Sequence, residues 1–558
     1  MSRDMSSSNQ FSGQQAVHIG TGNFALSHII PFYDKIGLDV QGISLRRGDT
    51  KKLLQDSDFD YTLAARDSLD FFEAEKVTAL KSITNVPMKE SNAPDDVIDA
   101  QRRQAIALIG DPKTAIVSMT VTINGYGFRE DPTKREIDWE TNSVVNKSRD
   151  ATDPEAEKVP LSSKDSETTV AYITAGLNER MRNGAGPIVV MSLDNMPLNG
   201  THLFRAVKEF ALEHYGPELF EWMRSNTFFP DTMVDRIAPT RDEKMIDEFV
   251  EGTGIENTRE SVVVITEKLP ERSLVISLPE QAEIEVGQPL NPVFINHPVI
   301  QALTQLPGVE QSPYANLYSE RKVHVFNGAH FGLAMVGRLA NKEYAHEALN
   351  NPAIAGFTER LLRELSSGVD PLLADQNGAY IQEFIDRVSN PHMKDELFRI
   401  GRNGSGKIFE RVLIPWYLAT TDKTSVKGLS HQAIDEVGAA WIRFVERGAQ
   451  AKSSGEVFDI NDSSGEEAGL LDLDPEMFSN AQGVLAKIGL MENTPGSEAF
   501  ASDLNASRSG LDRLLVEAER GYLPEAPELG PNRAVLSQLG IQITPVTIQP
   551  RAIDLTGS

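Results

Sequence analysis

Residues 16–28 read Ala16-Val-His-Ile-Gly20-Thr-Gly22-Asn23-Phe24-Ala25-Leu-Ser-His28, and this stretch indicates the architecture of the chain. A short apolar strand runs into a glycine pair and then into a helical pattern, the order found in a dinucleotide-binding βαβ unit. Gly20 would permit the tight turn, and Gly22 would let the backbone approach a pyrophosphate. The candidate cofactor-binding residues in this stretch are Gly20, Gly22, Asn23 and Phe24.

A second strand is predicted at residues 40–45, at the spacing that a βαβ unit requires. It ends in Arg46-Arg47-Gly48-Asp49. An acidic residue in this position binds the ribose diol of NAD, whereas an arginine accepts the 2′-phosphate of NADP. Asp49 and Arg46 are therefore both candidate cofactor contacts, and the residues alone leave the choice between NAD and NADP open.

The rest of the chain divides into two parts that differ in their hydrophobic periodicity. Up to about residue 300, β-branched apolar runs alternate with helical patterns. Strands are predicted at 115–122, 187–193, 262–266 and 274–277, with a helix at 167–183 and a polar surface insertion at about 129–168. Helical periodicity dominates after that point, and helices are predicted at 314–340, 343–350, 353–366, 377–387, 407–420, 430–447, 476–490 and 509–520, with an acidic loop at 449–475.

These patterns predict an α/β Rossmann-type N-terminal domain at 16–300 and a mostly helical C-terminal domain at 301–558. Residues 1–15 are polar and are expected to form a disordered tail. A chain of 558 residues is too long for one core, which agrees with at least two domains.

Composition excludes several classes of function. The chain has 81 acidic and 54 basic residues, a net charge of −27, which argues against binding to nucleic acid or to anionic membranes. It contains no cysteine, so disulfides, thiolate nucleophiles and cysteine-ligated metals are excluded. No metal site is predicted, although a site of histidines and carboxylates stays open. No signal sequence or membrane span is seen, so a cytoplasmic protein is expected.

The chemistry is suggested by the stretch Lys322-Val-His-Val-Phe-Asn327-Gly-Ala-His330. If this stretch is helical, Asn327 and His330 share a face, and Lys322 lies about 80° around the axis from His330. Polar groups embedded in an apolar helix indicate a site, because burying them is costly unless they are satisfied. A lysine with a depressed pKa can take a hydroxyl proton, an amide N–H can stabilise the alkoxide, and an imidazole can hold a neighbouring hydroxyl.

Two further polar positions follow apolar runs. Asn195 comes directly after the predicted strand at 187–193, and ligands of open α/β sheets bind beyond the carboxyl ends of the strands. An asparagine there is equally suited to cap a helix N-terminus. Asp235 and Arg236 form a second polar pair after an apolar segment.

Six motifs together resemble the polyol-specific long-chain dehydrogenase/reductase family, typified by mannitol 2-dehydrogenase. They are IGTGNFALSH (19–28), IVSMTVTINGYG (116–127), VMSLDNMPLNG (190–200), FPDTMVDRIAPT (229–240), KVHVFNGAH (322–330), and RVSNPHMKD (387–395) with RIGRNGSGKI (399–408). They span most of residues 16–447 in the family's order. The K-x4-N-x2-H and V-D-R patterns are fairly specific.

The resemblance implies metal-independent, NAD(P)-dependent hydride transfer between a polyol and a ketose, D-mannitol and D-fructose above all, in a cleft between the two domains. It implies that Lys322 is the general acid/base and that Asn195 and Asn327 stabilise the alkoxide. It further implies that His330 orients the substrate and that Asp235 and Arg387 contact it. NAD is the expected cofactor, with NADP as an alternative, and the protein is expected to be a monomer or a weak oligomer.

Three alternatives stay open at this point. The first is a dehydrogenase of another hexitol or of a pentitol. The second is a hexuronate reductase, for which Arg387, Lys394 or Arg402 would bind the carboxylate. The third is a non-catalytic dinucleotide sensor, which would have no need of a neutralisable Lys322.

Overall fold

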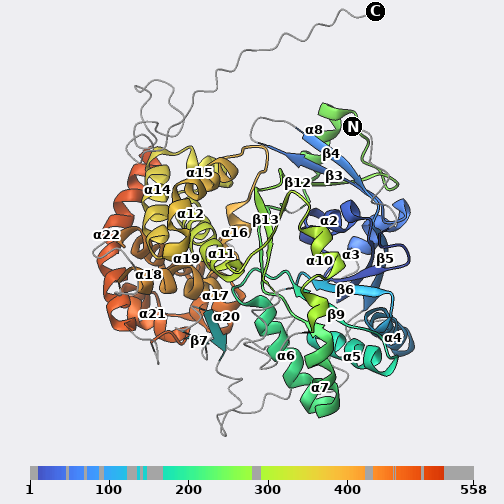
Figure 1. Ribbon diagram of the computed structural model, residues 1–558. Coiled ribbons are helices and arrows are strands. Elements are labelled where there is room, and N and C mark those ends of the chain that lie inside the picture. The colour runs from blue at the N-terminus through green and yellow to red at the C-terminus, as the bar shows by residue number, and fades with distance from the viewer. Residues whose placement is uncertain are drawn as a thin grey trace, which may run out of the picture.

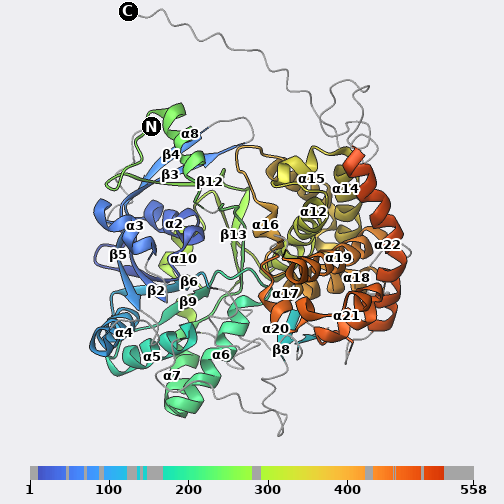
Figure 2. The ribbon, with the colours of Figure 1, turned by 180° about the vertical axis from the view of Figure 1, so that it is seen from behind.

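The computed structural model describes two lobes that lie side by side (Figures 1 and 2). The α/β lobe contains the blue-to-green part of the chain, and the helical lobe contains the yellow-to-red part. The structure describes residues 10–45, 49–67, 72–86, 94–121, 135–138, 143–146, 168–239, 241–278, 291–420, 431–455, 458, 460–491 and 496–520.

A six-stranded, fully parallel sheet forms the centre of the α/β lobe. Its spatial order is β10-β9-β6-β1-β2-β5. The strands are β1 (Gln15–Ile19), β2 (Asp39–Leu45), β5 (Leu80–Val86), β6 (Thr114–Met119), β9 (Ile188–Ser192) and β10 (Thr227–Phe228). The order reverses on the two sides of β1, which is the Rossmann arrangement that residues 16–28 predict.

Helices cover both faces of this sheet because its strands are apolar on both sides. Val189 and Met191 of β9 face one hydrophobic core, and Ile188 and Val190 face the other. The first core is completed by α2 (Ile29–Ile36) and α10 (Pro298–Leu303), and the second by α4 (Asp95–Gly110), α5 (Thr169–Arg182), α6 (Asn199–His214) and α7 (Pro217–Asn226). The expected strands at 40–45, 115–122 and 187–193 and the helix at 167–183 are confirmed to within a few residues.

Two smaller sheets were not expected from the sequence. One joins β12 (Val262–Glu267), β3 (Tyr61–Arg66) and β4 (Phe72–Val77), and the other joins β11 (Thr232–Val234), β13 (Arg272–Ile276) and β14 (Gly308–Gln311). The strands at 262–266 and 274–277 were predicted, but their partners β3, β4 and β14 were not. Short helices complete this lobe, namely α1 (Asn23–Ser27), α3 (Asp49–Leu54) and α8 (Glu243–Thr253).

The helical lobe is built around a central helix that is buried on all sides, α12 (Asn327–Leu339). Around it pack α14 (Pro352–Ser367), α15 (Asn377–Val388), α16 (Leu397–Gly401), α19 (Gln432–Ser454) and α22 (Ser497–Arg520). The remaining elements include α11 (Ala315–Arg321), α13 (Ala345–Leu349), α17 (Gly404–Ile408), α18 (Ile414–Thr420) and α21 (Ala481–Lys487), and two π-helices, η7 (Lys322–Phe326) and η9 (Phe409–Leu413).

The prediction of an acidic loop at 449–475 is wrong. Helix α19 continues to Ser454, and short helical segments follow at α20 (Ser463–Glu467), η10 (Leu470–Asp472) and η11 (Pro475–Ser479). These segments are stabilised by Asp462, which caps α20, and by the buried Ile460 and Leu470. The helix predicted at 509–520 also begins earlier, at Ser497.

Other parts of the prediction fall largely outside the described residues. Of the insertion at 129–168, the structure describes Thr168 and the backbone of one hairpin, formed by β7 (Arg135–Asp138) and β8 (Ser143–Asn146). This hairpin lies beside the helical lobe (Figures 1 and 2). Of the tail at 1–15, residues 1–9 are not described, whereas Phe11 is buried and Gln15 begins β1. Within the described residues, no helix has the length and the apolar composition that crossing a membrane requires.

Candidate active site

The glycine turn after β1 has the close backbone packing that a nucleotide-binding turn needs. Gly20 adopts a φ of +95°, and a Cβ there would lie 2.4 Å from the carbonyl oxygen of Thr120. Any other residue at this position would therefore clash with the neighbouring strand end. Gly22 is exposed, and a Cβ there would meet no atom within 4 Å, so the turn presents bare backbone to the space above it.

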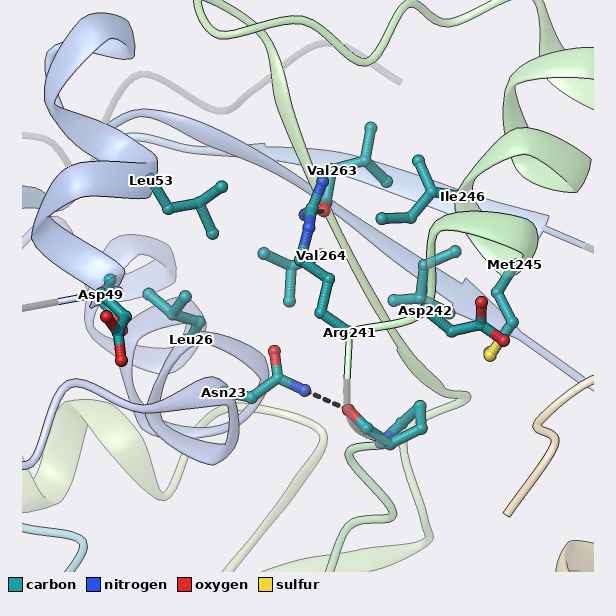
Figure 3. A pocket seen from close by; sticks show the side chains of 13 residues that line it. Asn23, Leu26, Asp49, Leu53, Arg241, Asp242, Met245, Ile246, Val263 and Val264 are labelled. Carbon is teal, nitrogen blue, oxygen red and sulfur yellow. Dashed lines mark hydrogen bonds between the residues drawn. The ribbon is translucent and has the colours of Figure 1, made fainter. Parts of the chain in front are cut away.

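A cavity of about 340 Å³ opens beside this turn (Figure 3). It is lined by Asn23 at the start of α1 and by Asp49 at the start of α3. The Asn23 amide donates to the carbonyl of Pro239 at 2.5 Å, which fixes one wall. Phe24 stacks on His28 with ring centroids 4.9 Å apart. Arg46 lies outside the described residues, so its predicted role stays a prediction.

Lys322 connects the two lobes. It begins the π-helix η7 in the helical lobe, and its Nζ donates a hydrogen bond of 2.7 Å to Oδ1 of Asn195. Asn195 stands three residues after β9, at the carboxyl edge of the parallel sheet. It does not cap α6, whose N-cap is Leu198. The amide oxygen of Asn195 thus accepts a hydrogen bond from Lys322, and the N–H groups of the same amide are available to a ligand.

Asn327 and His330 continue the same helical face. The backbone N–H of Asn327 donates to the carbonyl of Lys322, an i→i+5 bond that places the asparagine one turn beyond the lysine. His330 follows one turn later in α12. Within the described part of the chain, the buried Nδ2 of Asn327 has no hydrogen-bond acceptor. Such an orphaned donor indicates a ligand oxygen.

The environment of His330 is set by a carboxylate on the loop before α16. Its Nε2 lies 3.3 Å from Oδ2 of Asp395, and Asp395 also pairs with Arg399. Burial raises the pKa of Asp395, but the Arg399 guanidinium and the neighbouring His330 together outweigh burial and lower it to about 2. Burial lowers the pKa of His330 despite this carboxylate, so the imidazole is neutral at physiological pH.

Arg387 and Asp235, both predicted substrate contacts, form a clamp between the lobes. All the guanidinium N–H groups of Arg387, which lies on α15, donate to carboxylates. The guanidinium forms bidentate pairs with Asp235 (2.7 and 2.9 Å) and with Glu267 (2.7 and 3.0 Å). It also donates a 3.0 Å hydrogen bond to Glu383. Burial disfavours ionisation of Asp235, but Arg387 outweighs it and lowers the pKa. For Glu267 burial prevails and the pKa is raised.

The electrostatics around Lys322 favour a neutral amine. Burial lowers the pKa of Lys322 to about 8; Asp235 opposes this effect, while Arg387 and Arg411 add to it. Near physiological pH Lys322 can therefore both accept and release a proton.

Several residues near Lys322 were missed by the sequence analysis. Asp194 precedes Asn195, and burial raises its pKa to about 7. Glu267, Asp395 and Arg411 were likewise not singled out. Asp395 is the last residue of the RVSNPHMKD motif (387–395), and Arg411 lies three residues after the RIGRNGSGKI motif (399–408). These motifs gave the only sequence signal for the two residues, and Glu267 has none.

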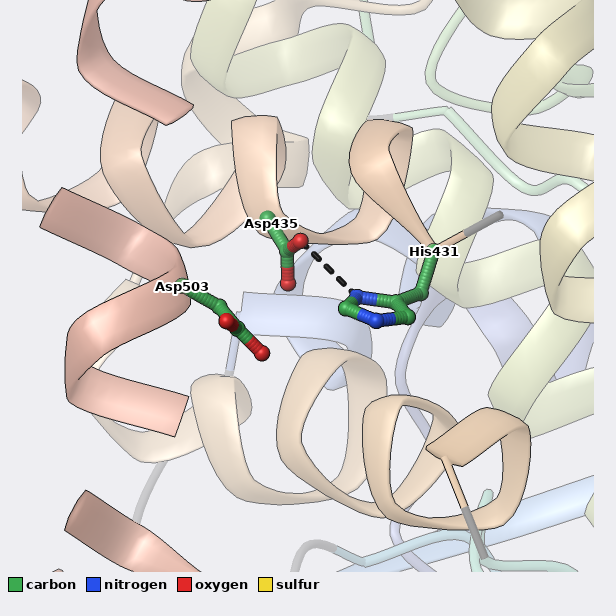
Figure 4. Close-up of side chains that lie close together, drawn as sticks. All are labelled: His431, Asp435 and Asp503. Carbon is green, nitrogen blue, oxygen red and sulfur yellow. Dashed lines mark hydrogen bonds and ion pairs between the residues drawn. The ribbon is translucent and has the colours of Figure 1, made fainter. Parts of the chain in front are cut away.

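A second polar cluster lies apart from these residues, in the helical lobe. His431, Asp435 and Asp503 have ligand atoms within 4.8 Å of one another (Figure 4). His431 Nδ1 is 2.9 Å from Asp435 Oδ2, and Asp503 accepts a bond from Trp416. Asp435 lies on α19, Asp503 lies on α22, and His431 is the N-cap of α19. These two helices carry none of the residues described above.

Two family models match the chain. The mannitol dehydrogenase Rossmann domain matches residues 14–267, and the mannitol dehydrogenase C-terminal domain matches residues 315–492. Among curated proteins, a mannitol 2-dehydrogenase of Emericella nidulans is 30% identical over 467 residues, which covers 81% of each chain. One from Pyrenophora tritici-repentis is 26% identical and covers 90% of this chain and 80% of its own.

Solved structures share the fold. A Pseudomonas fluorescens mannitol 2-dehydrogenase in ternary complex with NAD and D-mannitol superposes with a TM-score of 0.69 at 21% identity, covering 92% of this chain and 95% of that one. A D-sorbitol dehydrogenase in substrate-free form gives a TM-score of 0.63 at 20% identity, with 91% and 96% coverage.

Proposed function

The chain belongs to the mannitol dehydrogenase family, and from this premise we propose that it interconverts a polyol and a ketose with NAD as cofactor and Lys322 as the general acid/base. D-mannitol and D-fructose are the first pair to test, because the curated relatives are mannitol 2-dehydrogenases. The observation that supports the proposal best is the 2.7 Å bond between the Nζ of Lys322 and Asn195 across the two lobes.

In the oxidation direction, the reacting hydroxyl gives its proton to neutral Lys322. The N–H groups of Asn195 and Asn327 donate to the oxygen as negative charge develops on it, and they are held in place before reaction. His330, whose Nε2 lies 3.3 Å from Asp395, holds a neighbouring hydroxyl. In the reduction direction Lys322 returns the proton to the oxygen.

The chain's own residues fit NAD. Gly20 keeps the turn close to the strand, Gly22 leaves the backbone open, and Asn23 and Asp49 line the cavity beside it. Asp49 would accept from the ribose hydroxyls, and the cavity would hold the adenosine end. NAD supplies, when bound, the acceptor for the hydride.

The pKa of Lys322 predicts opposite pH dependences for the two directions. Oxidation needs the neutral amine, so kcat/KM for polyol oxidation should rise about tenfold per pH unit below about 8 and level off above it. Reduction needs the ammonium form, so kcat/KM for the ketose should be flat below about 8 and fall above it. Initial rates in both directions from pH 6 to 10 check this. Parallel profiles in the two directions would contradict it.

Replacing Asn195 with alanine is expected to lower kcat by about 10²–10³-fold, because one of the two donors to the developing alkoxide is removed. Substrate affinity should change much less, since the interaction strengthens in the transition state. Steady-state kinetics measure both constants. Asn350→Ala, at an exposed helix C-cap, is the matched control and should behave as wild type. An Asn195→Ala enzyme with an unchanged kcat would remove Asn195 from this role.

A substrate panel tests the proposed activity. We expect NAD-dependent oxidation of D-mannitol, D-sorbitol or D-arabinitol, reduction of the matching ketose, and weaker turnover with NADP. NAD binding without turnover of any polyol, ketose or hexuronate would favour the sensor alternative. Activity should persist in EDTA, and loss that zinc restores would reveal a metal-dependent reaction.

A further inference from the structure

The polar cluster of His431, Asp435 and Asp503 combines one imidazole with two carboxylates (Figure 4). Each residue offers one ligand atom, and these atoms lie within 4.8 Å of one another. The Nδ1 of His431 is 2.9 Å from Oδ2 of Asp435. Tetrahedral ligand atoms around Zn²⁺, each about 2.0–2.2 Å from the ion, stand about 3.4 Å apart. The spacing of the cluster is therefore close to that of a zinc site.

One oxygen of Asp435 is buried without a hydrogen-bond partner. The residue is 4% exposed, and its Oδ1 has no donor among the residues that the structure describes. Figure 4 shows this oxygen turned toward Asp503 rather than toward the bond with His431. A buried acceptor without a donor is costly and indicates a bound ion or water. Because Oδ1 faces a second carboxylate, a cation suits it best.

Close packing of two helices fixes the backbones of these two carboxylates opposite each other. Asp435 is on α19 and Asp503 is on α22. One turn after Asp435, a Cβ on Gly438 would lie 2.4 Å from Cδ2 of Leu504, the residue after Asp503. Glycine weakens a helix interior, and here it lets the helices approach. The carboxylates therefore stay near each other for as long as α19 and α22 remain packed.

The start of α19 does not need this cluster to cap it. Glu364 of α14 accepts hydrogen bonds from the backbone N–H groups of Ala433 and Ile434, at 2.7 and 3.1 Å. His431 is the N-cap residue, but its side chain makes no capping bond. The imidazole is therefore free of the usual structural role at this position.

The local charge favours a cation. Burial raises the pKa of the Asp435 carboxyl to about 7, an effect that the nearby His431 opposes. The Asp503 and Glu364 carboxylates raise it further. Three acidic groups thus act around one imidazole, and a bound cation would offset their mutual repulsion.

We propose that His431, Asp435 and Asp503 bind one divalent transition-metal ion, with Zn²⁺ the best suited, and that this ion joins α22 to α19. Imidazole nitrogen and carboxylate oxygen are both zinc ligands, whereas Ca²⁺ and Mg²⁺ prefer oxygen ligands alone. The ion would take the place of the hydrogen bond between His431 and Asp435. The site is structural and independent of the proposed function, because its helices carry none of the residues proposed for catalysis.

Titration calorimetry of untagged, EDTA-treated and dialysed full-length protein with Zn²⁺ at about pH 8 tests the site. We expect one zinc ion per chain in wild type. Affinity should fall at least about 30-fold in Asp435→Asn and in Asp503→Asn, because each loses an anionic ligand. Asp512→Asn removes an exposed carboxylate of the same helix α22 and should bind zinc as wild type does.

Trp416 provides an independent optical signal. Its Nε1 donates a 3.1 Å hydrogen bond to Asp503, and its ring lies edge-on to His431 with the centroids 6.3 Å apart. Co²⁺ bound at the cluster should therefore quench the fluorescence of this tryptophan. The chain has four tryptophans, so Trp416→Phe assigns the signal: it should lose most of the quenching while it still binds zinc.

Thermal unfolding separates a specific site from loss of fold. Zinc at about 100 times its Kd should raise the melting temperature of wild type by about 3–5 °C and leave that of Asp503→Asn unchanged. In EDTA the two proteins should melt at similar temperatures, which shows that the variant is folded. Absence of zinc binding to wild type would overturn the site, and so would equal binding to wild type, Asp435→Asn and Asp503→Asn.

Discussion

Replacing Lys322 with alanine is expected to lower kcat by about 10²–10⁴-fold in both directions, the contribution typical of a positioned general acid/base. The amine is buried, its pKa is about 8, and its Nζ is fixed by Asn195, so it is placed to exchange a proton with a substrate hydroxyl. NADH affinity should be nearly unchanged, because the glycine turn and the cavity beside it contain no atom of Lys322. Steady-state rates and fluorescence titration with NADH measure the two effects.

Lys487→Ala provides the control for this variant. Lys487 is exposed on α21 and outside the cleft, so its loss should leave both quantities at wild-type values. A Lys322→Ala enzyme that keeps more than about a tenth of the wild-type rate at neutral pH would be incompatible with a general acid/base role.

Replacing Arg387 with methionine should destabilise the protein by about 3–5 kcal/mol, because it leaves Asp235 and Glu267 buried without their counter-charge. The clamp joins α15 of the helical lobe to strand ends of the α/β lobe, so its loss should also weaken the contact between lobes. Urea denaturation followed by tryptophan fluorescence and by circular dichroism measures both.

Two comparison variants make this prediction specific. Arg443→Met breaks an exposed 2.9 Å pair with Asp512 and should cost no more than about 1 kcal/mol. Adding Asp235→Asn and Glu267→Gln to Arg387→Met removes the uncompensated charges and should recover part of the loss. A cost for Arg387→Met as small as that for Arg443→Met would show that the ion pairs do not stabilise the fold.

The centre of the Rossmann sheet was predictable because β1 and β9 are apolar runs, the first followed by the glycine turn and the second by Asp194-Asn195. Strands β5 and β10 were not predicted. The run at 187–193 is buried on both faces, so its sequence is apolar throughout. Such a strand can be predicted from its own residues, without knowledge of the strands that pair with it. The Lys322 motif was recognisable for a related reason: Lys322, Asn327 and His330 are polar groups in a largely apolar stretch, and their burial is observed.

The remaining features depend on long-range contacts. Strand β3 pairs with β12, about 200 residues later in the sequence, as well as with its neighbour β4, and the local pattern of β3 carries no sign of the distant partner. The segment after α19 was predicted to be a loop because most of its residues are charged or small. Two of its few apolar residues, Ile460 and Leu470, are buried in the helical lobe. The two π-helices have no distinct sequence pattern, so the placement of Arg411 against the Lys322 helix was not predictable.

Chemical rescue of Lys322→Ala tests the central claim most directly, because it asks whether a free amine restores what the side chain supplied. Oxidation of the best polyol should be recovered in part by methylamine or ethylamine, with a rate that rises with amine concentration and with the fraction of neutral amine. Arg387→Met, which keeps Lys322, should not respond to amines. If amines leave the rate of Lys322→Ala unchanged while the variant still binds NADH and polyol, Lys322 is not the proton carrier.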